Sequence, residues 1–119
     1  MTITNALASV AVANLAIAVT WYEKLFGRPP DTRPMAELAE WKFPKGGWLQ
    51  VYEADDARVG HGSVTLAVAS IAQQIADLRA LGIDPGEEMG GATVRVVMVK
   101  DPDGNSLAFA EARDPAIAQ

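Results

Sequence analysis

The chain has 119 residues, half of them hydrophobic, which is enough for one domain with its own core. It contains no cysteine, which excludes a disulfide framework and thiolate chemistry and is compatible with a cytoplasmic location. Its net charge of −5 argues against nucleic acid and anionic membranes as partners, although such a charge also serves solubility alone.

The N-terminal part reads as a strand followed by a helix. The apolar run Ala6–Val19 has no preceding Lys or Arg and is too short to cross a bilayer, so we expect no targeting segment. Asn14 is a suitable N-cap, and Gly27 is a suitable helix stop. Strand-like alternation places Val10 and Val12 before the cap. After it, helical spacing puts these residues on one face: Leu15, Val19, Tyr22, Leu25 and Phe26.

The middle of the chain is predicted to be extended. Pro29–Met35 is a weak, edge-like segment because its prolines cannot donate ladder hydrogen bonds. Glu37–Phe43 and Trp48–Glu53 predict a hairpin. Ala54–Gly62 is polar and glycine-containing, and it is the only plausible linker.

The pattern then restarts. Ser63–Val68 predicts a strand, and Ser70 with Gln73 fits a capping box in which Gln73 reaches back to the N-cap amide. A helix follows, with Ile71, Ile75, Leu78 and Leu81 as its apolar stripe and Gly82 as its stop. Three further strands are predicted after it: Gly86–Met89, Ala92–Val99 and a last strand from Ser106 to Ala112.

The two halves are related by an internal repeat. Leu49 and Glu53 recur as Leu107 and Glu111, each 58 positions later, and Val12 corresponds to Val68 at an offset of 56. The order β-α-β-β-β therefore occurs twice. We predict one α+β domain over residues 1–119, with module one at about 5–54 and module two at about 62–112.

Two segments carry a family resemblance. WYEKLFG (Trp21–Gly27) and GATVRVVMVKDPDGN (Gly91–Asn105), together with the duplicated order, resemble the vicinal oxygen chelate superfamily of glyoxalases, extradiol dioxygenases and bleomycin-resistance proteins. The resemblance implies two tandem modules whose curved mixed sheets surround a shared cavity, often in a dimer. It is weak for function, because this fold hosts several unrelated chemistries.

The resemblance also implies positions for metal ligands, which are Leu7, Gln50, Ser63 and Ala108 in this chain. Divalent metals prefer imidazole or carboxylate ligands, and only Gln50 offers even a weak one. A displaced site around His61 and Gln50 is the alternative, while the simpler interpretation of His61 is a solvated loop residue. We expect no metal and no cofactor.

Strand alternation suggests a ligand-binding wall. If Leu49 and Val51 face the helix, then Trp48, Gln50 and Tyr52 face the cavity. On the last strand the small residues Ser106, Ala108 and Ala110 face it in the same way. An aromatic wall with polar tips opposite a small-residue wall is typical of a small-molecule pocket, and a collapsed cavity filled by these side chains is the alternative. Trp41, with Phe43, would extend the aromatic wall, and Ser63 would border it.

Arg95 stands among valines in the middle of a predicted strand, where a charge needs a partner. It either holds a carboxylate or phosphate of a ligand, or pairs with one of four glutamates: Glu53, Glu87, Glu88 or Glu111. Ion pairing is the commoner arrangement.

These observations favour a metal-independent small-molecule binding protein that sequesters a drug or metabolite, rather than an enzyme. A metal-dependent lyase, isomerase or dioxygenase of the same superfamily, with a displaced ligand set, is the alternative. An interaction domain whose cavity is filled by its own side chains is a third. A homodimer is expected, because open curved sheets must cover their edges.

Overall fold

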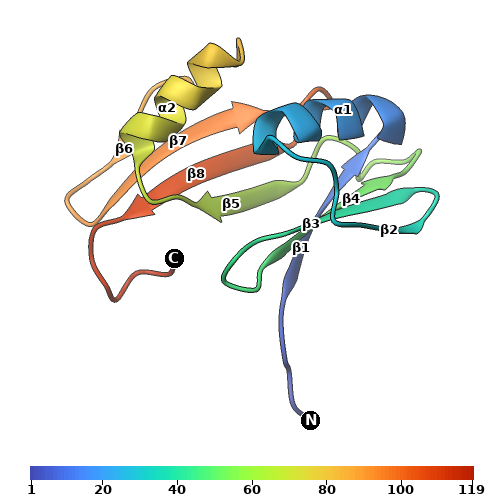
Figure 1. Cartoon of the computed structure of the whole chain (residues 1–119), viewed down its shortest axis with the longest axis horizontal. Helices are drawn as coiled ribbons and strands as arrows, with labels where there is room; N and C mark the ends of the chain where they lie inside the picture. The colour runs from blue at the N-terminus through green and yellow to red at the C-terminus, as the bar shows by residue number, and fades with distance from the viewer. The chain divides into compact units, whose positions relative to one another are not determined.

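The computed structural model describes all residues, 1–119, and shows the β-α-β-β-β order twice (Figure 1). The first set is β1 (Leu7–Val12), α1 (Leu15–Phe26), β2 (Thr32–Met35), β3 (Leu38–Lys42) and β4 (Trp48–Glu53). The second set is β5 (Ser63–Ala67), α2 (Ile71–Ala80), β6 (Met89–Gly90), β7 (Val94–Lys100) and β8 (Ser106–Ala112). The duplicated module predicted from the sequence is confirmed.

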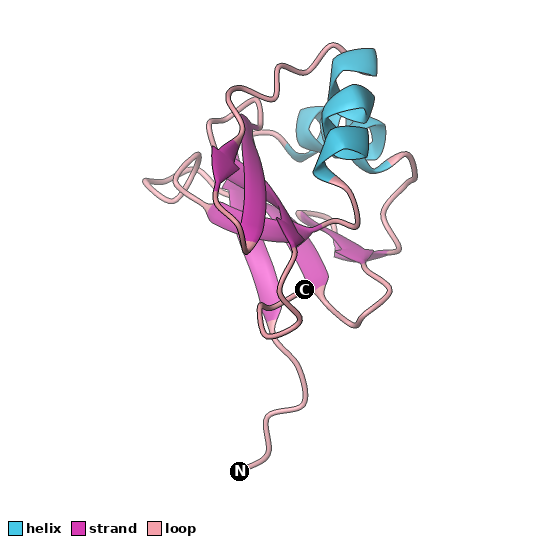
Figure 2. Ribbon diagram, turned by 90° about the vertical axis from the view of Figure 1, so that its left-hand side faces the viewer, coloured by secondary structure: helices cyan, strands magenta, loops and turns pink.

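The chain forms two compact units, each built on one four-stranded mixed sheet. The first unit comprises Met1–Gly62 together with Asp101–Asn105, and its sheet has the order β1-β4-β3-β2. The outer strand β1 runs parallel to β4, whereas β4, β3 and β2 are successively antiparallel. The residues before Leu7 have no regular secondary structure and run as a loop away from β1 (Figure 2).

Helix α1 covers one face of the first sheet and begins and ends as predicted. Asn14 Oδ1 accepts a hydrogen bond of 3.1 Å from the Ile17 amide, and Gly27 ends the helix with a φ of 72°. A second cap comes from β4, where Glu53 Oε2 accepts a 2.9 Å bond from the Leu15 amide. Two of the four amides that a helix N-terminus leaves without partners are thereby satisfied.

The core between α1 and the sheet is aromatic. The ring of Tyr22 packs at centroid distances of 5.8 Å from Phe26 and 5.9 Å from Trp41, and Phe26 packs at 5.4 Å from Phe43. The Tyr22 hydroxyl donates a buried 2.8 Å bond to Asp101 Oδ2. Burial, reinforced by the charge of Asp101 and by this hydrogen bond, raises the pKa of Tyr22 far above its ordinary value.

The turn Asp101–Asn105, which joins β7 to β8, belongs to the first unit because its polar side chains bond there. Asn105 is fully buried; its Nδ2 donates to Ala11 O at 2.9 Å, and its Oδ1 accepts from the Gly62 amide at 2.8 Å. Asp101 Oδ1 accepts from the backbone amides of Asp103 and Asn105 at 3.0 and 2.9 Å. The hairpin motif is therefore a fully satisfied buried polar network.

The second unit comprises Ser63–Lys100 and Ser106–Gln119, and its sheet has the order β5-β8-β7-β6. Its register repeats that of the first sheet, with β5 parallel to β8 and the others antiparallel. The short strand observed here is β6 at Met89–Gly90, at the end of the predicted segment Gly86–Met89.

Helix α2 is capped as α1 is. Ser70 Oγ accepts from the Gln73 amide at 3.2 Å, and Glu111 Oε1 accepts from the Ile71 amide at 2.8 Å. The expected return bond from the Gln73 side chain to the N-cap amide is wrong. Gln73 Nε2 donates to Asp77 at 2.8 Å instead, because a residue four positions along lies on the same helix face. Neither α1 nor α2 is long and apolar enough to cross a membrane.

Candidate functional site

The face of the first sheet that α1 leaves uncovered, here called the open face, carries the predicted aromatic wall. On β4, Leu49 and Val51 are buried toward the helix, whereas Trp48, Gln50 and Tyr52 are half-buried on the other side. The alternation inferred for this strand is therefore confirmed. It follows from the two-residue period of a strand that has one buried face.

A row of hydrogen bonds crosses all four strands of the open face. Ser9 Oγ on β1 donates to Gln50 Oε1 at 2.8 Å, and Gln50 Nε2 on β4 donates to Glu40 Oε2 at 2.7 Å. Thr32 Oγ1 on β2 then donates to Glu40 Oε1 at 2.7 Å. The donors point toward Glu40, which accepts from both sides and forms no ion pair. The amide of Gln50 is consequently held in one orientation.

Two cations lie over the aromatic rings that flank this row. Lys42 Nζ is 5.8 Å from the ring centroid of Trp48, and the Arg58 guanidinium is 5.4 Å from that of Tyr52. Asp56 holds Arg58 through side-chain bonds of 2.8 to 3.1 Å. These bonds, helped by one from the Arg58 backbone amide, lower the pKa of Asp56 to about 2. Both rings thus lie at positions where a positive charge is favourable.

Trp41 is not part of the aromatic wall, and the expectation that this residue extends the wall is wrong. Its side chain is 0% exposed and packs on the helix side of β3 against Tyr22 and Phe26. The indole Nε1–H donates to Arg28 O at 3.1 Å, so the buried ring has its polar partner. Phe43 has the same parity and packs against Phe26.

The side chains at the metal-ligand positions implied by the superfamily do not fit a divalent metal. In the first unit Leu7 is a hydrocarbon, and the amide oxygen of Gln50 already accepts from Ser9. In the second unit Ser63 and Ala108 offer one hydroxyl and one methyl group. His61 is exposed in the loop before β5, and no three His, Asp or Glu side chains lie close enough together to hold a metal ion.

The open face of the second sheet is made mostly of small and apolar side chains. On β8, Leu107 and Phe109 are buried toward α2, so Ala108 and Ala110 lie on the other side, as predicted. Thr65 of β5 and Met98 of β7 are the register partners of Ala108, and Ser63 is exposed at the start of β5. One side-chain hydrogen bond crosses this face, from Lys100 Nζ to Ser106 Oγ at 2.9 Å, and it joins two strands, whereas the row in the first unit joins four.

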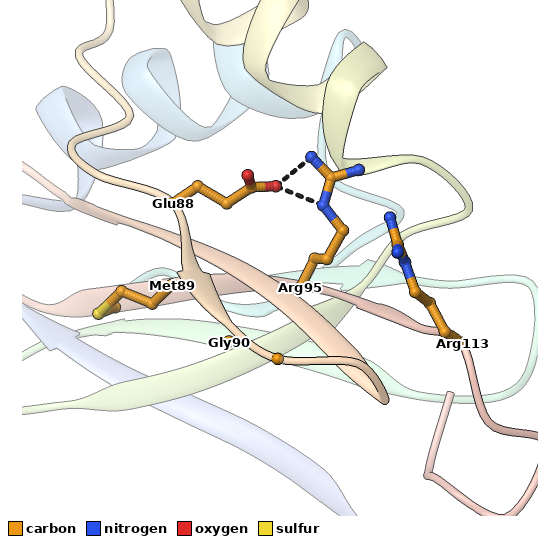
Figure 3. Close-up of a pocket in the computed structure, with 6 residues that line it drawn as sticks. Glu88, Met89, Gly90, Arg95 and Arg113 are labelled. Atoms are coloured by element: carbon orange, nitrogen blue, oxygen red, sulfur yellow. Dashed lines mark hydrogen bonds and ion pairs between the residues drawn. The ribbon is translucent and has the colours of Figure 1, made fainter.

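Arg95 lies on the helix side of the second sheet, because it shares its parity with the buried residues Val97 and Val99. It forms an ion pair with Glu88, which is one of the four partners considered from the sequence. Figure 3 shows the pair at a shallow surface hollow beside β6 and β7. Arg95 therefore does not lie on the uncovered face of its own sheet.

Sequence reasoning singled out Gln50 but not the partners that hold it. Ser9, Glu40 and Lys42, which belong to the same face, are not among the residues predicted from the sequence. One signal was present in the sequence. In Leu38–Lys42, Ala39 and Trp41 alternate with Glu40 and Lys42, and that pattern assigns the polar pair to the exposed face. Ser9 is recognisable only from its register with Gln50.

No family model and no curated protein sequence matches the chain. Among solved structures, a glyoxalase/bleomycin resistance protein from Catenulispora acidiphila is 31% identical, with 91% of this chain and 97% of that one aligned at a TM-score of 0.79. An antibiotic binding protein from a Streptomyces species is 19% identical (94% and 98% covered, TM-score 0.81) and shows the same fold. A lactoylglutathione lyase from Agrobacterium tumefaciens, at 18% identity (97% and 98% covered, TM-score 0.77), also shows this fold.

The duplicated module and the 31% identity over nearly the whole chain lead to one assignment: the chain belongs to the glyoxalase/bleomycin resistance protein family and has the fold of the vicinal oxygen chelate superfamily.

Proposed function

We propose that this chain is a metal-independent small-molecule binding protein that holds its ligand against the open face of the first sheet. The observation that carries the proposal is the hydrogen-bonded row through Gln50 and Glu40, flanked on the same strand by Trp48 and Tyr52. Flat apolar area beside a few fixed polar groups is the usual composition of a small-molecule site.

Each part of this face has a role in binding. The rings of Trp48 and Tyr52 offer stacking area, over which Lys42 and Arg58 now lie. A planar ligand would displace the Lys42 and Arg58 side chains or lie beneath them. Glu40 has unused acceptor capacity and no cationic partner, so it favours a ligand that presents N–H or O–H donors. The mechanism is stoichiometric sequestration, with Gln50 orienting the ligand.

The family supports binding of a drug or metabolite. The relative at 31% identity is described as a glyoxalase/bleomycin resistance protein, and a structure of the same fold is an antibiotic binding protein. Independence from a metal is supported by the poor ligand chemistry of Leu7, Gln50, Ser63 and Ala108.

Tryptophan fluorescence tests the binding proposal. The chain is titrated with a panel of antibiotics that carry planar aromatic groups, including bleomycin, and we expect saturable quenching with at least one of them. The three tryptophans are Trp21, Trp41 and Trp48, and quenching should disappear in Trp48→Phe but persist in Trp21→Phe, the matched control. Quenching that survives Trp48→Phe would place the ligand elsewhere and contradict the proposal.

Elemental analysis tests independence from a metal. The protein is purified without chelator, analysed for bound metal, and then titrated with Zn²⁺, Ni²⁺ and Fe²⁺. We expect no metal at useful stoichiometry. One tightly held equivalent per chain that is lost in His61→Ala would overturn the proposal and support a metal-dependent lyase, isomerase or dioxygenase. Lactoylglutathione lyase activity would then be assayed with the metal added.

We also propose that the chain forms a homodimer. Four large apolar side chains remain exposed on the strands: Leu7, Met35, Met89 and Met98. Burying such groups is favourable at about 25 cal/mol per Å² of apolar surface. Sedimentation at micromolar concentration should give twice the chain mass of 12.6 kDa, whereas a monomer at all concentrations would contradict this proposal.

A further inference from the structure

Two arginines of the second unit meet at a surface hollow that the proposed function does not use. Arg95 on β7 and Arg113, which follows β8, line a depression of about 230 Å³ beside the β6–β7 hairpin. The rest of its lining is Glu88, Met89, Gly90 and Gly91. Figure 3 shows the two arginine side chains next to one another, with their guanidinium groups extending in the same direction.

The sequence forces Arg95 toward this hollow. Val97 and Val99 are buried under α2, and the strand period therefore places Arg95 on the helix side. Its register partner on the neighbouring strand β8 is Glu111, and its register partner on β6 is Gly90. Gly90 has no side chain that could cover the guanidinium. The arginine therefore reaches the hollow without obstruction.

The carboxylates that neutralise the two arginines are held very differently. Glu111 caps α2 through the 2.8 Å bond from the Ile71 amide. That bond, and then the charges of Arg113 and Arg95, lower the pKa of Glu111, which stays ionised and in place. Glu88 has no other hydrogen bond and presents a single oxygen, Oε1, to both Nε and Nη2 of Arg95. Glu88 is therefore the replaceable partner.

The guanidinium groups also retain unused donors. An arginine carries five N–H donors, and Arg95 uses only those that reach Glu88 Oε1. Arg113 approaches Glu111 at 3.5 Å and keeps 47% of its side chain exposed. A carboxylate or phosphate group with two or three oxygens could form the parallel two-bond contact that Glu88 does not form.

We propose that this hollow binds a small oxyanion, a carboxylate or phosphate group, and that Glu88 occupies the oxyanion's place in the free protein. Arg95 provides the two-bond contact, and Arg113 adds the second positive charge. Binding replaces the Glu88–Arg95 ion pair by an oxyanion–Arg95 pair and moves the Glu88 carboxylate into solvent. The site shares no residue with the open face of the first sheet, because all of its residues belong to the second unit.

The test is a titration with inorganic phosphate, and separately with acetate, followed by NMR shifts of the Gly90 and Gly91 amides at constant ionic strength. We expect saturable shifts in the wild type. Removing the competing charge in Glu88→Gln should tighten binding about two- to fivefold, since an exposed ion pair is worth up to about 1 kcal/mol. Arg95→Gln should weaken it about tenfold or more, because it removes charge-assisted bonds. Stronger binding of phosphate than of acetate would assign the site to phosphate groups.

Lys24→Gln is the matched control, since it removes one exposed positive charge on α1 in the first unit and should leave the titration unchanged. Arg113→Gln should weaken oxyanion binding less than Arg95→Gln does. If Arg95→Gln does not fold, weaker oxyanion binding by Arg113→Gln tests the proposal in its place. The proposal is wrong if neither wild type nor Glu88→Gln gives a saturable shift, or if Glu88→Gln binds more weakly than wild type. The last result would mean that Glu88 positions Arg95 rather than competing with the oxyanion.

Discussion

Glu40 and Gln50 face each other as register partners on β3 and β4, and the Gln50 amide donates a 2.7 Å hydrogen bond to the Glu40 carboxylate. The bond fixes which end of the amide faces Glu40, and the carbonyl end is then free to accept from Ser9. A group that is already oriented loses little conformational entropy when a ligand arrives. This pair makes the open face a preorganised surface rather than a set of independent side chains.

Neutralising Glu40 should weaken ligand binding without unfolding the protein. Glu40→Gln keeps the size of the side chain and removes the charge that attracts ligand donors. We expect affinity for the ligand found by fluorescence screening to fall about tenfold, as for loss of a hydrogen bond to a charged group. Glu37→Gln is the control, since Glu37 is exposed in the turn before β3. An equal loss in both variants would point to net charge rather than to a specific contact.

Asn105→Ala should destabilise the first unit strongly. The change removes the bonds to Ala11 O and from the Gly62 amide. It leaves the partly buried Gly62 amide without a partner, and Ala11 O keeps only the 3.3 Å bond from the Gly60 amide. We expect the free energy of unfolding to fall by about 3 kcal/mol, measured by urea denaturation. Asn5→Ala removes one exposed bond, to Gly46 O, and should cost well under 1 kcal/mol. Similar costs for the two variants would contradict the larger contribution expected of the buried bonds.

Gly60→Ala should be poorly tolerated because of a backbone collision. Gly60 has a φ of 79°, and a Cβ there would lie 2.2 Å from Asp103 O. We expect a loss of about 2 kcal/mol or more in unfolding free energy, since strain and the displacement of Asp103 add together. At Gly47, with no positive φ and no atom within 4 Å of a Cβ, alanine should be neutral or slightly stabilising. Thermal unfolding of the two variants checks the contrast.

The cap that Glu111 places on α2 should make stability fall in acid. The Ile71 amide, and then the charges of Arg113 and Arg95, lower the pKa of Glu111 below its ordinary value of 4.5. The carboxylate therefore stabilises the fold above pH 4.5, and its contribution is lost as the pH falls through the lowered pKa. Urea midpoints measured from pH 7 to pH 3 should decline less in Glu111→Gln than in the wild type. Glu87→Gln should decline as the wild type does.

Local chemistry in the sequence was sufficient for the elements and for their repetition. Asn14 and Gly27 delimit α1, and Ser70 begins α2, because caps act on amides within one helical turn. The alternation Leu49–Gln50–Val51 identified both faces of β4, because side-chain direction in a strand is set by the neighbouring peptide units. Both Glu53 and Glu111 occur at equivalent places in the repeat, although the helix that each one caps was not foreseen.

Only the tertiary structure decided which distant groups meet. Trp41 joined the core because Tyr22 and Phe26 offer it aromatic contacts and Arg28 O accepts its N–H. Asn105 bonds to Ala11, 94 residues away, and that contact assigns the turn between β7 and β8 to the first unit. The sequence by itself determined what each strand and helix would be and which residues share a face. Register and long-range packing determined which faces meet, because those contacts join residues that exert no influence on one another until the chain has folded.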